Sequence, residues 1–264
     1  MPSAPRAFVL VACLAACGGG PSEDDVVRSE AQFNLGRQLA EERDVAGAFQ
    51  HLLEAVRLNP GFTEAHLVLG TLYLQRGDFA ESEHHLLEAL RTGEGSGRPD
   101  LASATNNSLG VLYIHTHRYD DAIRVLRTAA TDLMNREPYN AWGNLGWAYY
   151  EEHEYDQALD ALGHAVQLQP RFCNGWYRMG QVHFARGESG AADGFTQADQ
   201  ALSRVLETDH PACQALQDAW LLRGETRARL GRREEAVSDL ERCVELSAET
   251  ESGRACARFL EAHP

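Results

Sequence analysis

Apolar residues recur along most of this 264-residue chain at the three-to-four-residue spacing of helices that bury one face. The runs come in pairs, and the first run of each pair contains a glycine. In most pairs this glycine is followed at fixed distances by a small residue, a large apolar residue and another small residue. The pattern predicts six helix–turn–helix units, whose glycines are Gly36, Gly70, Gly110, Gly146, Gly180 and Gly224.

The fourth unit shows the pattern most completely. Its two helices carry Trp142, Leu145, Gly146, Tyr149, Ala158, Leu162 and Ala165, and Pro170 follows. This arrangement resembles the tetratricopeptide (TPR) repeat, a unit of about 34 residues. Small residues let the two helices approach closely where they cross, and proline ends the second helix. The resemblance implies an all-α solenoid of six repeats over residues 26–248, and an unrelated helical bundle is the alternative.

The distances between successive glycines are uneven, at 34, 40, 36, 34 and 44 residues. The excess predicts two insertions: a lengthened loop at 91–99 and an extension at 190–194, inside the fifth repeat. Insertions in solenoids often bear function, but neutral drift explains them equally well. After the sixth repeat, residues 249–264 are expected to form a capping helix and tail that cover the open apolar end.

The first residues are expected to be a targeting segment outside the fold. A short apolar run ends in Leu14-Ala15-Ala16-Cys17, which resembles the lipobox of bacterial lipoproteins. The resemblance implies a signal peptide at 1–16, acylation of Cys17 (palmitate among the acyl groups) and a flexible tether within 17–25. Because Gly18 and not Asp follows the cysteine, it also implies sorting to the outer membrane, facing the periplasm. An ordinary secretory signal is the alternative.

The net charge is −15. This acidic balance argues against nucleic acid as a partner, because nucleic acids attract basic surfaces. It also argues against direct adhesion to anionic lipid.

Four cysteines remain after the N-terminal segment. In an oxidising periplasm they predict two disulfides, with three pairings open. Cys243 and Cys256 are equidistant from the expected turn between two antiparallel helices, and Cys173 and Cys213 lie near the starts of successive first helices. The geometry therefore favours these two pairs. Four buried free thiols are the alternative.

No catalytic or metal-binding constellation stands out in the sequence. His84 and His85 are adjacent, and His115 and His117 flank one residue, but neither spacing is that of a recognised metal site. Histidines on a solvated helix surface are the simpler interpretation. We therefore expect no enzyme activity, no cofactor, no metal and no small-molecule substrate.

The concave face of a TPR array is lined by its first helices. In repeats three to five these helices offer amides beside aromatic rings, and amides bond an extended backbone as both donor and acceptor. The alternative is that the aromatic rings only pack between helices. The predicted partner-binding groove consists of Asn107, Val111, Asn140, Asn144, Trp147, Tyr150, Tyr177 and Gln181.

A lipobox, a short tether and six TPRs together resemble the pilotin-type lipoproteins of type IV pilus biogenesis. The asparagine-rich stretches 106–110 and 140–146 are similar to theirs. The resemblance implies a chaperone-like scaffold that helps a secretin subunit assemble at the outer membrane. The competing function is a periplasmic adaptor for peptidoglycan enzymes or another envelope complex.

Overall fold

The computed structural model describes residues 20–96, 99–207 and 210–262. The expected signal peptide at 1–16 and the expected acylation site Cys17 lie outside these ranges. Within them the chain forms fourteen α-helices and no strand. It divides into two compact units, residues 1–62 and 63–264, which are described in turn.

The first unit contains one helix pair, α1 (Glu23–Glu41) and α2 (Val45–Leu58). Helix α1 begins inside the expected tether. Its start is capped by the Ser22 hydroxyl, which accepts a hydrogen bond from the Asp25 backbone N–H at 3.1 Å. The acidic side chains in the first turn also interact favourably with the positive end of the helix dipole. The tether prediction is therefore wrong for residues 23–25.

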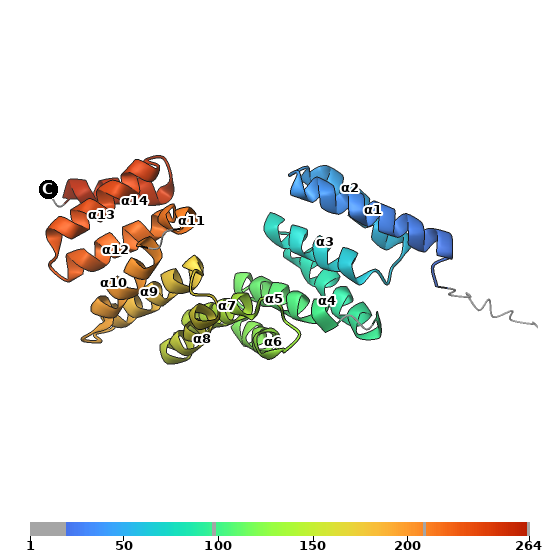
Figure 1. The fold of residues 1–264 in the computed structure, drawn as a ribbon, viewed down its shortest axis with the longest axis horizontal. Helices are drawn as coiled ribbons and strands as arrows, with labels where there is room; N and C mark the ends of the chain where they lie inside the picture. The colour runs from blue at the N-terminus through green and yellow to red at the C-terminus, as the bar shows by residue number, and fades with distance from the viewer. Residues whose placement is uncertain (1–19, 97–98, 208–209, 263–264) are drawn as a thin grey trace, which may run out of the picture. The chain divides into compact units, whose positions relative to one another are not determined.

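The second unit contains five further helix pairs, each packed on the next to form a solenoid (Figure 1). The pairs are α3 (Thr63–Arg76) with α4 (Phe79–Ser96), α5 (Pro99–His115) with α6 (Tyr119–Thr131), α7 (Pro138–Glu151) with α8 (Tyr155–Leu168), α9 (Cys173–Glu188) with α10 (Gly194–Leu206), and α12 (Gln217–Arg229) with α13 (Arg233–Leu246). A short helix, α11 (Pro211–Gln214), precedes α12. The last helix, α14 (Glu251–Ala262), packs on α12 and α13.

A glycine of the first helix meets a leucine of the second in every pair. A Cβ atom added to any of the six glycines would lie 2.2–2.8 Å from the leucine Cγ, closer than real Cβ contacts. Each leucine is at most 1% exposed. The glycine is thus needed for the close approach of the two helices, as the repeat pattern predicts. The six leucines are Leu52, Leu86, Leu126, Leu162, Leu202 and Leu240.

The turn inside each repeat contains one residue with a positive φ. The backbone N–H that follows it donates to a carbonyl five residues earlier, as in Arg118 N to Tyr113 O at 2.8 Å. This is the Schellman arrangement, which satisfies the free carbonyls at a helix end. The left-handed residues are Arg43, Gly77, His117, His153, Gly190 and Gly231.

The loop expected at 91–99 is wrong, because most of this stretch is helical. Helix α4 continues to Ser96, and α5 starts at Pro99. Thr63 donates from its hydroxyl to that of Thr92 at 2.9 Å, which ties the extra turn of α4 to the start of α3. Gly93 lies against Thr63, where an added Cβ would be in van der Waals contact with the threonine methyl group. A contact from 29 residues away therefore stabilises a helix that the glycines alone disfavour.

The extension expected at 190–194 forms the turn between α9 and the first residue of α10. Gly190 adopts φ +94° there, a conformation that glycine accepts without steric cost. Part of the extra length of the fifth repeat lies elsewhere. It forms α11, between α10 and α12, which the sequence analysis did not predict.

Candidate functional site: a groove along α5, α7 and α9

Helices α5, α7 and α9 are the first helices of repeats three to five, and α7 packs against both of the others. Hydrogen bonds connect their polar side chains across the repeats. Asn144 donates through Nδ2 to Oδ1 of Asn107 at 3.0 Å. Arg178 donates through Nη1 to Asn144 Oδ1 at 3.0 Å and to the Gly143 carbonyl at 2.9 Å. The two predicted asparagines are therefore brought together, and an arginine joins them.

The predicted aromatic residues take two different positions. Trp147 stacks on Tyr150 with ring centroids 4.7 Å apart, and the Arg178 guanidinium lies 5.2 Å from the Trp147 ring. Tyr150 and Tyr177 also pack against buried core residues. Burial raises the pKa of Tyr177 to about 12, so its hydroxyl stays neutral. For these two tyrosines, helix packing accounts for much of their surface, whereas Trp147 lines an open hollow.

Two hollows lie between α5 and α7, on either side of the Asn107–Asn144 hydrogen bond. The first, of about 390 Å³, is lined by Val111, Ile114, His115, His117, Tyr119, Asn144, Trp147, Glu151 and Arg178. The second, of about 410 Å³, is lined by Ser103, Ala104, Asn107, Ser108, Asn135, Arg136, Glu137 and Asn140. We call them the Trp147 hollow and the Asn140 hollow. Together they offer both polar and apolar surface along α5 and α7.

The three remaining predicted groove residues take no part in the hydrogen bonds between repeats described above. Asn140 donates to the Glu137 carboxylate at 3.1 Å and lines the Asn140 hollow. Val111 lines the Trp147 hollow. Gln181 is half-buried on α9 but does not line either hollow. The sequence analysis did not include Arg178, Tyr119 and Glu151 in the groove. They line the Trp147 hollow because α9, α6 and α7 bring them there.

One histidine differs from the sequence expectation. His85 was expected on a solvated surface, but it is 8% exposed and its Nδ1 lies 3.0 Å from Nδ1 of His66. One ring must donate this hydrogen bond and the other accept it. Burial, followed by the neighbouring His66 and His84, lowers the pKa of His85 to about 4. His84, His115 and His117 are exposed.

Both expected cysteine pairs lie at bonding distance, with Cα atoms 5.3 Å apart for Cys173 and Cys213 and 6.3 Å apart for Cys243 and Cys256. His210 lies near the first pair. In the part of the chain that the structure describes, these three residues form the one group whose possible ligand atoms all lie within 4.8 Å of one another. The two sulfur atoms are bonded to each other, which removes them as thiolate ligands.

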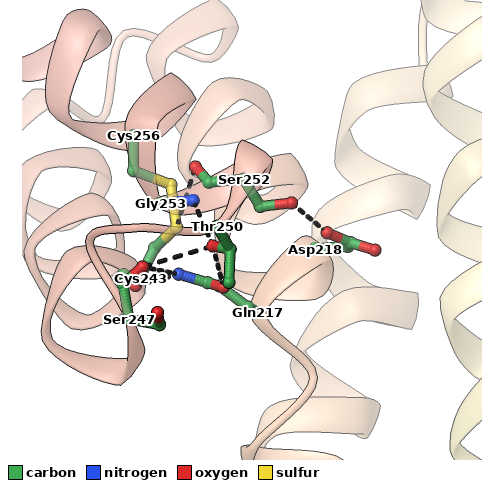
Figure 2. Close-up of a disulfide and its surroundings, with 8 residues drawn as sticks. All are labelled: Gln217, Asp218, Cys243, Ser247, Thr250, Ser252, Gly253 and Cys256. Carbon is green, nitrogen blue, oxygen red and sulfur yellow. Dashed lines mark hydrogen bonds between the residues drawn. A yellow bond between two sulfur atoms is a disulfide. The ribbon is translucent and has the colours of Figure 1, made fainter.

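The second disulfide lies where α13 turns into α14. Figure 2 shows the Gln217 side chain directed into this turn. Its Nε2 donates to the carbonyls of Cys243 and Ser247, both at 2.6 Å, and its Oε1 accepts from the Thr250 hydroxyl at 2.6 Å. The last helix is thus held to the sixth repeat by a covalent bond and by a hydrogen-bonded glutamine.

Three family models, each described as a tetratricopeptide repeat, match residues 62–133, 139–172 and 217–250. Together they cover just over half of the sequence. The chain is a TPR protein. TPR repeat-containing protein MJ1428 of Methanocaldococcus jannaschii is 33% identical over 76 residues. That match covers 29% of this chain and only 13% of the relative.

Two solved structures share the fold over almost their whole length. One is PilW, described as a widely conserved type IV pilus biogenesis factor; its TM-score is 0.73 at 18% identity, covering 86% of this chain and 97% of PilW. The other is PilF of Pseudomonas aeruginosa, with a TM-score of 0.70 at 16% identity, covering 92% of this chain and all of PilF. MamA is less similar, with a TM-score of 0.53. At these identities the likeness concerns the fold.

In the described ranges no helix has the length and apolar character needed to cross a bilayer.

Proposed function

We propose that this protein is a scaffold for type IV pilus biogenesis, and that its groove holds an extended segment of a secretin subunit. The observation that carries the proposal is the match to PilW and PilF, which spans nearly all of both proteins and most of this chain. TPR arrays have no catalytic site of their own and act through the surface they present. The protein therefore works by binding another protein, without catalysing a reaction.

The groove supplies the chemistry for such binding. Asn107 accepts a hydrogen bond from Asn144 and also lines the Asn140 hollow. Its side-chain amide can bond the backbone of a segment that passes along α5 and α7. Trp147 offers an aromatic surface for an apolar side chain in the adjoining hollow. An extended segment that runs through both hollows contacts these groups in turn.

We further propose that Cys17 is acylated and anchors the protein to the outer membrane, facing the periplasm. The Leu14-Ala15-Ala16-Cys17 sequence supports this. Several acyl chains make anchoring stable, since each buried methylene contributes about 0.8 kcal/mol. An anchored scaffold raises the effective concentration of a bound subunit at the membrane where it assembles. Mass spectrometry of the mature N-terminus tests the anchor, and an N-terminus without lipid would overturn it.

The functional test is the secretin multimer in cells that make type IV pili. Trp147→Ala should lower the multimer and leave monomer behind, because a truncated hot-spot aromatic costs about 2 kcal/mol or more of binding. The matched control is Leu168→Ala on α8, a large residue that is 55% exposed and outside both hollows. Circular dichroism checks that both variants fold.

Two results would count against the proposal. If Trp147→Ala folds and multimers stay at the control level, the groove does not hold the secretin. If deletion of the whole protein leaves multimers unchanged, the pilus function fails, and an adaptor for peptidoglycan enzymes becomes the better explanation.

A further inference from the structure

The Cys173–Cys213 disulfide differs from the Cys243–Cys256 disulfide in its surroundings. Both cysteines of the second pair are fully buried. In the first pair Cys213 is 1% exposed, but Cys173 is only half-buried, and the neighbouring His210 is accessible to solvent. The possible ligand atoms of Cys173, His210 and Cys213 all lie within 4.8 Å of one another. In the described part of the chain, no third ligand lies that close to the other pair.

His210 and Cys213 are presented by one tight turn. Helix α11 begins at Pro211, and the backbone N–H of Cys213 donates to the His210 carbonyl at 3.0 Å. Two residues therefore separate the two possible ligands, a spacing that neighbouring ligands of zinc sites commonly have. The His210 ring has no bonding partner among the described residues, so its nitrogens are available to a ligand.

Cys173 comes from a different helix, as the first residue of α9. The start of a helix favours negative charge, and the thiolate is the form of cysteine that binds metal ions. Cys213 belongs to a buried cluster with Leu202 and Val205, and Cys173 packs against the same cluster. The core thus holds both cysteines in place, with their Cα atoms 5.3 Å apart, whether or not the two sulfur atoms are bonded.

Reduction converts this pair from a bond into two ligands. A dithiol donor supplies two electrons and two protons: the S–S bond breaks, two thiols form on this chain, and the donor becomes a disulfide. A divalent metal ion that binds then displaces the two thiol protons. Because a Zn–S bond is about 2.3 Å long, two thiolates on a tetrahedral zinc ion lie about 3.8 Å apart. Rotation of the two side chains reaches this separation from the observed Cα positions.

We propose that reduction of the Cys173–Cys213 disulfide opens a Zn²⁺ site whose ligands are Cys173, Cys213 and His210. Two thiolates and an imidazole are ligands that suit zinc, and the accessible side of His210 leaves the fourth position to water. The ion would replace the disulfide as the link between α9 and α11. A helix of four residues is not stable by itself, so α11 depends on such a link.

This site lies outside both hollows of the groove and does not depend on the proposed function. For the reduced protein it replaces the sequence-based expectation of no metal. The oxidised protein has no thiolate to offer, so the redox state of one disulfide decides whether the ion binds.

The test uses the full chain with Cys13→Ser and Cys17→Ser, so that the four cysteines of the fold are its only thiols. The protein is reduced with a phosphine, desalted without oxygen and titrated with Co²⁺, a spectroscopic probe for zinc sites. The reduced chain should bind one Co²⁺, with the near-ultraviolet absorption of cobalt–thiolate bonds and the visible bands of tetrahedral cobalt. Added Zn²⁺ should displace it, and the oxidised chain should show no such absorption.

Substitutions then locate the ligands. His210→Gln should weaken Zn²⁺ binding by the reduced chain at least tenfold, whereas His164→Gln, at an exposed histidine of α8, should leave it unchanged. Replacing both Cys173 and Cys213 with serine should abolish the cobalt–thiolate absorption. Circular dichroism checks that each variant folds.

Three outcomes would overturn the proposal: no cobalt–thiolate absorption although thiol titration shows that both disulfides are open, equal absorption in the Cys173→Ser, Cys213→Ser variant, or an affinity unchanged by His210→Gln. If the serine variant does not fold, alkylation of the reduced native cysteines decides. Zn²⁺ should slow the labelling of Cys173 and Cys213 at least tenfold and leave Cys243 and Cys256 at their metal-free rates. Equal protection of both pairs, or of neither, would also overturn the proposal.

Discussion

Arg223 and Asp239 form a two-pronged ion pair inside the sixth repeat, with Nε–Oδ2 at 2.9 Å and Nη2–Oδ1 at 2.7 Å. Their side chains are 6% and 3% exposed. Arg227 donates a third hydrogen bond to the same carboxylate at 2.8 Å. One aspartate thus pairs with two buried guanidinium groups between α12 and α13. Its loss leaves Arg223 with only the longer contact to Glu207 at 3.6 Å, whereas Arg227 keeps its ion pair with Asp199.

Asp239→Ala should lower the free energy of unfolding by about 3–5 kcal/mol, because breaking a buried pair from one side leaves an uncompensated charge. Urea denaturation followed by circular dichroism measures the change. The matched control is Glu245→Ala on the same helix, where an exposed pair with Arg242 should contribute about 0–1 kcal/mol. Equal effects of the two substitutions would show that Asp239 has no special role.

The sequence predicted the helix pairs because their crossing depends on short-range pattern. Gly146 and Leu162 lie within one repeat, only 16 residues apart, and a similar spacing recurs along the chain. The extended α4 was missed for the opposite reason. Gly93 and Gly95 disfavour helix locally, and the hydrogen bond from Thr63 that stabilises the extra turn comes from 29 residues away. Long-range side-chain contacts of this kind leave no periodic signal.

The candidate site shows the same division. The asparagines and Trp147 were found because they occupy groove positions of first helices. Arg178 was not assigned a role, since its position depends on the Gly143 carbonyl and the Asn144 side chain accepting its hydrogen bonds. The burial of His85 was also missed. A histidine beside another histidine gives no sequence signal that distinguishes a solvated surface from a buried pair.

The glycine–leucine crossings predict a sharp contrast between two glycines of the fourth repeat. A methyl group at Gly146 would lie 2.5 Å from Leu162 Cγ and 3.0 Å from the Ala158 carbonyl oxygen, so Gly146→Ala should destabilise by about 1–3 kcal/mol. At Gly163, on α8, the added Cβ would meet no atom within 4 Å beyond its chain neighbours and the backbone of its own helix. Gly163→Ala should instead stabilise by about 0.5–1 kcal/mol, because alanine favours helix over glycine. Thermal unfolding of both variants measures the difference, and a shift of the same sign in both would contradict the crossing model.

The disulfide between Cys243 and Cys256 should hold α14 to the sixth repeat. Its residues are 13 apart in sequence, and closing a loop of about this length stabilises by roughly 3 kcal/mol in the chain-entropy model. Replacing both cysteines with serine should speed amide hydrogen exchange in α14 more than in α7. Residual protection is expected from Gln217, which still bonds the Ser247 carbonyl. Non-reducing peptide mapping should recover this pair and Cys173 with Cys213, whereas four alkylatable thiols in protein from an oxidising compartment would refute both bonds.

The buried histidine predicts a loss of stability in mild acid. Burial, then His66 and His84, lower the pKa of His85 from 6.5 to about 4, while Glu88 opposes the shift. Between these two values the unfolded chain takes up a proton that the folded chain does not, so stability is full above pH 6.5 and falls as the pH drops towards 4. Each unit of pKa difference corresponds to about 1.4 kcal/mol, so the free energy of unfolding should fall by an amount on the order of 3 kcal/mol. Urea titrations at pH 7 and pH 4.5 should therefore show a smaller difference for His85→Gln than for the native protein. The control is His164→Gln, whose ring is exposed and which should keep the native pH dependence. An unchanged pH dependence in His85→Gln would mean that His85 does not titrate as its burial requires.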